Sequence, residues 1–187
     1  MPWPVTILLE WMGDQPMPAS LLERVRRQVS AAFGCATDLR AVHSPPTETL
    51  DPRRGQHSST RILRWMQGRL TPGTGKLLGI TDRDLCIPVL TFVFGEAQIG
   101  GPAAVVSTAR LGRTYDGRRA SPGLAEARLT KECLHELGHT FGLVHCVNPT
   151  CVMSRSNSVL DVDRKRAAFC GDCRLRLREL EEERGAS

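Results

Sequence analysis

Apolar positions follow both a strand-like and a helix-like period in the first part of the chain. Val5 to Leu9 is a short apolar run typical of a buried strand, and from Ser20 the apolar residues recur at helical intervals. Ser20 and Glu23 have the spacing of a capping box, and Gly34 stands where a glycine would end the helix. We expect a second strand over Asp38 to Val42.

The next part of the chain predicts a loop, a helix and three further strands. The proline-containing stretch from Pro45 to Gln56 indicates a surface loop, and Ser58 to Gly68 has apolar residues at helical spacing. The strand candidates, separated by turn-rich pieces, are Leu77 to Thr81, Val89 to Gly95 and Ala103 to Ala109. The order β-α-β-α-β with two more strands indicates an α/β fold.

Pro72 to Lys76 resembles the centre of a phosphate-binding loop, but two required positions do not fit. Leu70 stands where the first glycine belongs, and Leu77 stands where the Mg²⁺-binding serine or threonine belongs. The segment also precedes a predicted strand instead of opening a helix. We therefore interpret it as a turn.

The composition is that of an ordinary globular domain. The chain has 187 residues, of which 41% are hydrophobic and 24% charged, and this excludes disordered and collagen-like classes. No stretch approaches about eighteen consecutive apolar residues, and Met1 to Pro4 has neither the basic region nor the cleavage site of a signal peptide. We expect a soluble cytoplasmic monomer with no membrane partner.

The chain has many more arginines than lysines, 22 against 3. Its formal net charge is +5. The arginines are spread along the chain, and codon bias explains their number as well as phosphate binding does. No helix-turn-helix, RNP motif or basic stripe with aromatic residues accompanies them. A nucleic-acid partner therefore remains a background alternative.

The segment from His135 to His145 carries the candidate chemistry. At about 3.6 residues per turn, His135 and His139 lie on one helix face, close enough for both imidazoles to bind one Zn²⁺. Gly142 can take the left-handed conformation that ends a helix, so the chain can turn and bring His145 to the same ion. The fourth position is left for water, which is typical of a catalytic zinc.

Glu136 sits beside this metal and not on it. It would accept a proton from water and deliver a proton to the leaving amine, so the pattern predicts peptide-bond hydrolysis. Two alternatives remain open. The histidines could belong to an ordinary amphipathic helix packed through Leu134, Leu137 and Phe141, or they could form a site without activity. The added glycine and third histidine make HExxHxxGxxH more specific than HExxH alone.

Four of the seven cysteines lie in two close pairs, Cys146 with Cys151 and Cys170 with Cys173. Four thiolates suit a closed tetrahedral Zn²⁺ site, which would be structural and would tie the chain after the active helix to the C-terminal segment. A redox Cys-x-x-Cys pair is the alternative, but it leaves the first pair unexplained. We expect the isolated cysteines to be buried as small hydrophobes: Cys35, Cys86 and Cys133.

This block of motifs resembles the archaemetzincins, a branch of the metzincin zinc peptidases. The resemblance rests on the histidine followed directly by cysteine, on Cys151-Val152-Met153, on the later Cys-x-x-Cys, and on the strands around Val93 to Ala97 and Val105 to Ser107. It implies that Met153 forms a turn beneath the catalytic zinc. It also implies two zinc ions, a catalytic one at His135, His139 and His145 with Glu136 as the base, and a structural one at Cys146, Cys151, Cys170 and Cys173.

The same resemblance implies a metzincin-like fold, with a five-stranded twisted sheet above a horizontal cleft. The substrate would be a peptide or protein lying antiparallel to an exposed edge strand, here Thr91 to Ala97. We expect one catalytic domain over residues 1–187. Residues 1–142 would hold the sheet, its backing helices and the active-site helix, and residues 143–187 would hold the four-cysteine site.

The remaining candidates are less informative. The single tyrosine, Tyr115, lies in a turn-like segment, and we do not assign it a role at the oxyanion. His43 and His57 fall in loop-like stretches and are expected to be solvated. The alternating charges of residues 174–184 are typical of an exposed terminal helix. A two-zinc protein that binds peptides or partners with negligible turnover remains the alternative to a peptidase.

Overall fold

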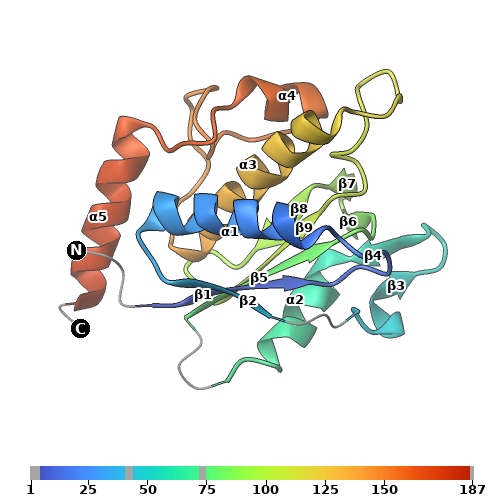
Figure 1. The fold of residues 1–187 in the computed structure, drawn as a ribbon. Helices are drawn as coiled ribbons and strands as arrows, with labels where there is room; N and C mark the ends of the chain where they lie inside the picture. Colours follow the sequence, from blue (N-terminus) through green and yellow to red (C-terminus); the bar gives the residue numbers. More distant parts are fainter. Residues whose placement is uncertain (1–4, 41–43, 72–74, 186–187) are drawn as a thin grey trace.

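Five strands form a mixed sheet at the centre of the molecule (Figure 1), which is described from a computed structural model for residues 5–40, 44–71 and 75–185. The strand order is β2-β1-β5-β9-β8. The first four strands run parallel, and β8 runs antiparallel to β9, which confirms the expected five-stranded sheet. The strands are β1 (Ile7–Trp11), β2 (Thr37–Arg40), β5 (Lys76–Thr81), β8 (Gly95–Ala97) and β9 (Ala103–Ser107).

A second sheet of four short strands, in the order β3-β4-β6-β7, was not predicted. Its members are β3 (Leu50–Asp51), β4 (Gln56–Ser58), β6 (Leu85–Ile87) and β7 (Leu90–Val93). Two of these strands lie in or at the end of the stretch that we expected to be a loop, which also contains a 3-10 helix, η1 (Thr47–Thr49). Strands as short as these carry no readable period, so only their pairing in the folded chain defines them.

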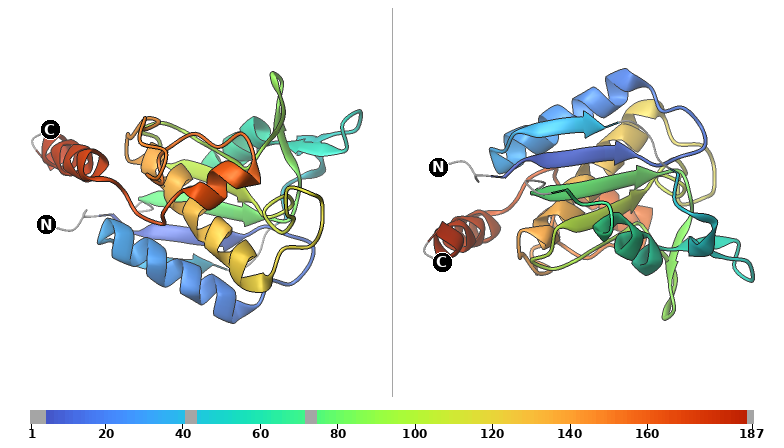
Figure 2. Two further views of the ribbon diagram at one scale, coloured as in Figure 1. Left: turned by 90° about the horizontal axis from the view of Figure 1, so that it is seen from above. Right: turned by 90° about the horizontal axis from the view of Figure 1, so that it is seen from below.

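The predicted strand from Val89 to Gly95 is divided between the two sheets. β7 pairs with β6, whereas β8 pairs with β9, and Phe94 lies at the junction. The predicted continuous edge over Thr91 to Ala97 is therefore wrong in part, because only β8 forms the edge of the five-stranded sheet. The β6–β7 hairpin projects from the body of the molecule (Figure 2).

Helices cover both faces of the central sheet. Seen from above and below, α1 and α3 lie on one face and α2 on the other (Figure 2). The helices are α1 (Ala19–Phe33), α2 (Ser59–Gln67), α3 (Pro122–Thr140), α4 (Val159–Arg164) and α5 (Gly171–Gly185), the last confirming the predicted terminal helix.

The ends of α1 and α2 test the predicted caps. α1 ends at Gly34 with φ 65°, as expected. Its predicted capping box is absent, because α1 begins after Pro18 with no side-chain cap and Glu23 pairs instead with Arg26. α2 begins after Ser58, whose side chain accepts a hydrogen bond from the Arg61 amide.

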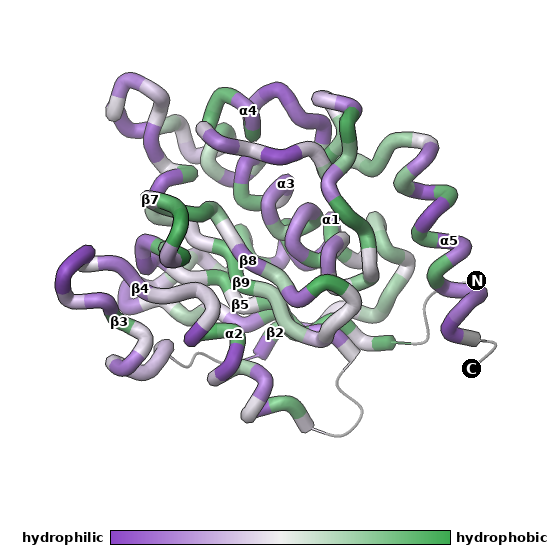
Figure 3. Tube along the Cα trace, turned by 180° about the vertical axis from the view of Figure 1, so that it is seen from behind, coloured by the Kyte–Doolittle hydropathy of each residue, from purple (hydrophilic) through white to green (hydrophobic). Residues whose placement is uncertain are grey.

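Strand β5 shows why the sheet is buried on both sides. Leu78 and Ile80 point into the core beneath α1 and α3, while Leu77 packs on the opposite face with α2. Most of β5 and β9 is coloured as hydrophobic, as expected for strands that are buried (Figure 3). Parallel strands covered by helices on both faces are nearly continuous in apolar residues, which is why this segment was predictable.

Two of the predicted segments fall partly outside the described residues. These are the end of the second strand, with His43, and the centre of the segment that resembles a phosphate loop. Lys76, the last residue of that segment, is the first residue of β5, so the segment leads into a strand as predicted. Within the described ranges, no helix is long and apolar enough to cross a membrane.

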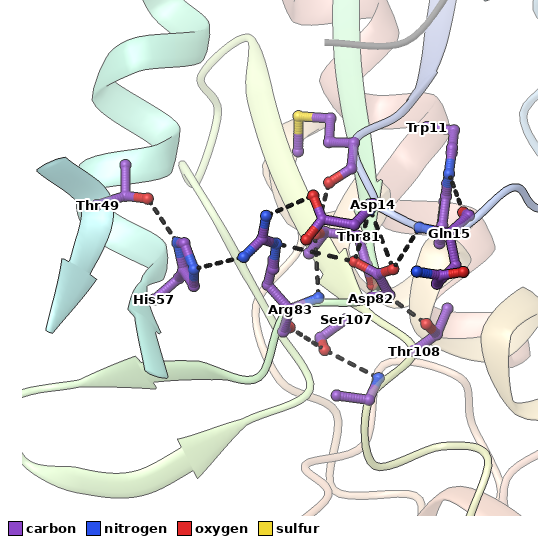
Figure 4. A network of polar contacts seen from close by, with 12 residues as sticks. Trp11, Asp14, Gln15, Thr49, His57, Thr81, Asp82, Arg83, Ser107 and Thr108 are labelled. Carbon is purple, nitrogen blue, oxygen red and sulfur yellow. Dashed lines mark hydrogen bonds and ion pairs between the residues drawn. The ribbon is translucent and has the colours of Figure 1, made fainter. Parts of the chain in front are cut away.

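His57 is buried, and the prediction that it is solvated was wrong. It is 5% exposed on β4, its Nδ1 donates to Thr49 Oγ1 at 2.7 Å, and its Nε2 accepts from Arg83 at 3.4 Å. Arg83 in turn pairs with Asp14 after β1 (Figure 4). Burial, with the Arg83 charge, lowers the pKa of His57. The composition of this segment resembles that of a loop, which is why the prediction failed. His57 is buried because the segment forms β4, a strand of the second sheet.

Candidate active site

Helix α3 presents the first part of the HExxHxxGxxH motif. Ser121 caps it by accepting from the Leu124 amide at 3.3 Å, and Pro122 occupies the first turn, where its missing N–H costs nothing. Apolar residues of α3 pack into the core, among them Leu129, Cys133, Leu134 and Leu137. The helix is therefore fixed by burial.

Two backbone carbonyls orient the first two histidines. The Nδ1 of His135 donates to the carbonyl of Val152 at 2.8 Å, and the Nδ1 of His139 donates to the carbonyl of Leu143 at 2.7 Å. Each neutral ring then has a lone pair on Nε2, and these two atoms are 3.2 Å apart. Tetrahedral zinc ligands at about 2.0–2.1 Å are roughly 3.3–3.4 Å from each other, so a shared ion explains a distance at which two lone pairs would repel.

The third histidine reaches the same place through a turn at Gly142. Its φ of 103° lies in the region that favours glycine, and the chain reverses there as predicted. The His145 ring centroid is 4.9 Å from that of His139 and 5.3 Å from that of His135. One donor atom from each of the three rings lies within 4.8 Å of the others.

The surroundings of the three imidazoles favour the neutral form, which is the form that binds metal. Burial is the main cause and lowers the pKa of His135, His139 and His145, the last to about 4. The positive charges of Lys165 at His135 and of Arg155 at His145 act in the same direction.

Glu136 is buried beside the triad, beneath the edge strand. It is 5% exposed, and a Cβ on Gly95 of β8 would lie 2.7 Å from its Cγ. Only glycine therefore allows β8 to pass so close to this side chain. Burial, followed by the charge of Glu132, raises the pKa of the Glu136 carboxyl well above its usual range, while Lys165 opposes the shift.

These groups open into a cleft of about 580 Å³. Residues 89–95 form one wall and residues 155–157 the other, with Glu132, His135, Glu136 and His145 among the lining groups. The structure thus brings His135, His145 and Glu136 to the surface of an accessible cavity, and His139 completes the triad behind them. Tyr115 is exposed, at 73%, on a loop and does not line this cavity.

The four paired cysteines form a second cluster. The Sγ atoms of Cys146 and Cys170 are 3.7 Å apart, as are those of Cys151 and Cys173. Thiolates at about 2.3 Å from a tetrahedral zinc are roughly 3.8 Å apart, so the cluster fits such an ion. The Asn148 amide donates to Cys146 Sγ at 3.4 Å, as does the Cys170 amide to Cys151 Sγ. The isolated cysteines are buried, as predicted.

Met153 connects the two clusters. It is fully buried, its carbonyl accepts from the Cys146 amide at 2.9 Å, and its Sδ lies so close to Gly138 that a Cβ there would clash. The preceding residue, Val152, supplies the carbonyl that orients His135. The turn around Met153 therefore links the cysteine cluster to a histidine of the triad.

Comparisons with known proteins agree with this arrangement. The family model described as peptidase family M54 matches residues 68–179. An archaemetzincin of Methanopyrus kandleri is 39% identical over 89% of this chain and 91% of its own length. The crystal structure of the archaemetzincin from that organism superposes with a TM-score of 0.84 at 37% identity, covering 95% of this chain and 96% of the other.

This chain belongs to the archaemetzincins, peptidase family M54. A structure titled as a zinc-dependent peptidase, from Methanocorpusculum labreanum, has a TM-score of 0.79 at 32% identity, covering 91% of this chain and 99% of that one. Family membership makes this archaemetzincin a metallopeptidase by class and confirms the expected fold.

Two charged residues near the site of this archaemetzincin were not singled out from the sequence. Lys165, after α4, donates to Glu132 Oε1 at 3.2 Å, and both side chains are buried. The Lys165 Nζ also lies 3.4 Å from His135 Nδ1. The sequence could have indicated Glu132, because it precedes Glu136 by one helical turn. It could not have indicated the partner of Glu132, because Lys165 lies 33 positions further along the chain.

Lys76 is a third such residue, at the end of the active-site helix. Its Nζ donates to the carbonyl of Thr140 at 2.6 Å and to that of Gly101 at 2.9 Å, and the residue is 2% exposed. A lysine at a helix C-terminus satisfies carbonyls that lack helical partners. Burial, followed by the charge of Arg184, lowers the pKa of Lys76 to about 8.

This pKa predicts how the free energy of unfolding depends on pH. The ordinary pKa of lysine is 10.5 and the folded value is about 8, so between them the unfolded chain binds more protons at Lys76. The stability of wild type relative to Lys76→Met should therefore rise between about pH 8 and pH 10.5, by roughly 3 kcal/mol. Urea unfolding of both proteins across this range measures it. A difference that stays constant over this range would contradict the lowered pKa of Lys76.

Proposed function

We propose that the chain hydrolyses peptide bonds with Glu136 as general base beside a zinc ion held by His135, His139 and His145. A second, structural zinc is held by the four-cysteine cluster. The observation that carries the proposal is the 3.2 Å approach of the Nε2 atoms of His135 and His139, next to a buried carboxyl in an open cleft. The zinc-dependent peptidase among the similar structures supports the choice of metal.

Zinc bound at the triad would supply a Lewis acid that polarises the scissile carbonyl and makes water more acidic. The residues of the chain do the rest. Hydrogen bonds from Nδ1 to the carbonyls of Val152 and Leu143 keep the ring orientations of His135 and His139 fixed. Glu136 takes the proton of the attacking water and then delivers a proton to the leaving amine. Its raised pKa suits a group that must hold a proton between these two steps.

The substrate in this proposal is an extended peptide beside β8. This strand pairs with β9 on one side, and it is the last strand of the sheet among the described residues. Main-chain hydrogen bonds to such an edge bind any extended peptide, and neighbouring pockets give selectivity. Gly95 places this edge directly over Glu136, so a peptide paired with it passes the base.

The test is cleavage of a diverse short-peptide library by the zinc-loaded protein, with products identified by mass spectrometry. The Glu136→Gln protein, purified in the same way, serves as the blank, and a chelated sample tests the metal. We expect cleavage products that are absent from the Glu136→Gln sample and from the chelated sample. Identical profiles from two proteins that each hold two zinc ions would contradict hydrolysis and favour the alternative, a two-zinc protein that binds peptides without turnover.

A further inference from the structure

The cleft extends to one side of Glu136, and this side determines which part of a bound peptide the cleft would hold. Gly95 lies against Glu136, and the rest of that wall comes from residues 89–94, before Gly95 in the chain. The Ser107 amide donates to the carbonyl of Phe94 at 2.7 Å, so the edge of the central sheet continues in this direction. This inference rests on the proposed function, in which an extended peptide lies beside β8. With the peptide antiparallel to β8, as expected from the sequence, the residues after the cleaved bond pass residues 89–94. The cleft therefore holds the leaving fragment.

The two walls of this cleft differ in character. The hairpin wall is apolar, with Val89 83% exposed and Leu90 also exposed, and its hydrophobic colour is visible at β7 (Figure 3). Arg155 lies in the opposite wall with an exposed side chain. Among the described residues, its guanidinium has no carboxylate within ion-pair distance and no hydrogen bond.

The acidic groups around Arg155 already have other partners. Glu132 pairs with Lys165. Asp161 accepts from the amides of Asn157 at 3.1 Å and Ser158 at 3.0 Å. Its carboxylate thus holds the segment that follows Arg155, and its ion-pair partner is Arg164, at 3.9 Å.

We propose that Arg155 selects substrates whose leaving fragment carries a carboxylate close to the cleaved bond. An arginine fork binds a carboxylate through two parallel hydrogen bonds, and this arrangement gives the cleft a charge preference that its apolar wall lacks. The carboxylate is either an aspartate or glutamate side chain or the C-terminal carboxylate of a short peptide. In both cases Arg155 is a specificity-determining residue and takes no part in proton transfer.

The test compares matched peptides built on a sequence that the zinc-loaded protein cleaves. One series has glutamate or glutamine at each position after the cleaved bond, with an amidated C-terminus. A second series is neutral and ends in an acid or an amide, which separates the two sources of the carboxylate. We expect wild type to prefer the acidic peptide in one series by about 5- to 10-fold in kcat/KM, and less at high salt.

Arg155→Gln should remove this preference by lowering kcat/KM for the acidic peptides more than for the matched neutral peptides, and Arg155→Lys should keep part of it. Arg166→Gln is the matched control, because Arg166 is an exposed arginine on the chain after α4 and does not line the cleft. Equal rates for acidic and neutral peptides in wild type, or a preference that survives in Arg155→Gln, would overturn the role of Arg155.

A binding measurement separates this inference from the proposed function. Fluorescently labelled acidic and neutral peptides are titrated into zinc-loaded Glu136→Gln, with and without Arg155→Gln. The acidic peptide should bind about 5- to 10-fold more tightly, and only when Arg155 is present. If no peptide is cleaved but this difference is found, hydrolysis fails and the carboxylate site stands. If neutral peptides are cleaved but acidic and neutral peptides bind equally well, hydrolysis stands and the role of Arg155 is wrong.

Discussion

Replacing Glu136 by glutamine should lower kcat/KM roughly 100- to 10,000-fold while both zinc ions remain bound. Glutamine has the same size, so it fills the buried position beside Gly95, but its amide cannot accept the proton of the attacking water. The loss should fall mainly on kcat, because the carboxylate acts on the reacting atoms. Peptide cleavage rates and zinc content of the purified variant measure the two parts of this prediction.

The matched control is Glu126→Gln on the same helix. Glu126 lies near the start of α3 and pairs with Arg24 at the surface, so its loss should cost about 0–1 kcal/mol of stability and leave cleavage unchanged. Activity of Glu136→Gln within tenfold of wild type would exclude Glu136 as the base. A loss of zinc from that variant would instead show that the carboxylate contributes to the metal site.

Replacing Cys173 by serine should destabilise the protein by several kcal/mol and reduce its zinc content from two ions to one. The cluster holds together the chain on both sides of α4, so the binding free energy of its ion is also folding free energy. Thermal unfolding and zinc analysis of the purified variant measure this effect. Cys86→Ala is the control, because Cys86 is a buried isolated thiol, and its replacement should keep two ions.

The same variant should also weaken the catalytic site, by about 10- to 100-fold in zinc affinity. Cys151 directly precedes Val152, whose carbonyl accepts from His135 Nδ1, so a loosened cluster no longer fixes this ring. Competition with a chelator of known affinity measures the change. Wild-type affinity at the triad in a variant that has lost the structural ion would show that the two sites are independent.

The chemistry of this protein is determined by local spacing. His135 and His139 share a helix face because they are four residues apart, and Gly142 turns the chain because glycine tolerates a φ of 103°. The paired cysteines and the buried strand β5 are local patterns in the same sense. A spacing of a few residues fixes such relationships whatever the rest of the chain does, so the triad, the two cysteine pairs and most long elements could be predicted. The fold then brings the two cysteine pairs together across α4.

Tertiary structure decided the features that join distant segments. The edge strand is divided at Phe94, His57 is enclosed by a second sheet, and Lys165 reaches Glu132 from after α4. Lys76 caps a helix that ends 64 residues later in the chain. None of these has a local signature, because short strands have no readable period and a buried charge finds its partner only when the core has packed. The sequence by itself determined which atoms could hold zinc, whereas the fold decided what orients them and which charges face the cleft.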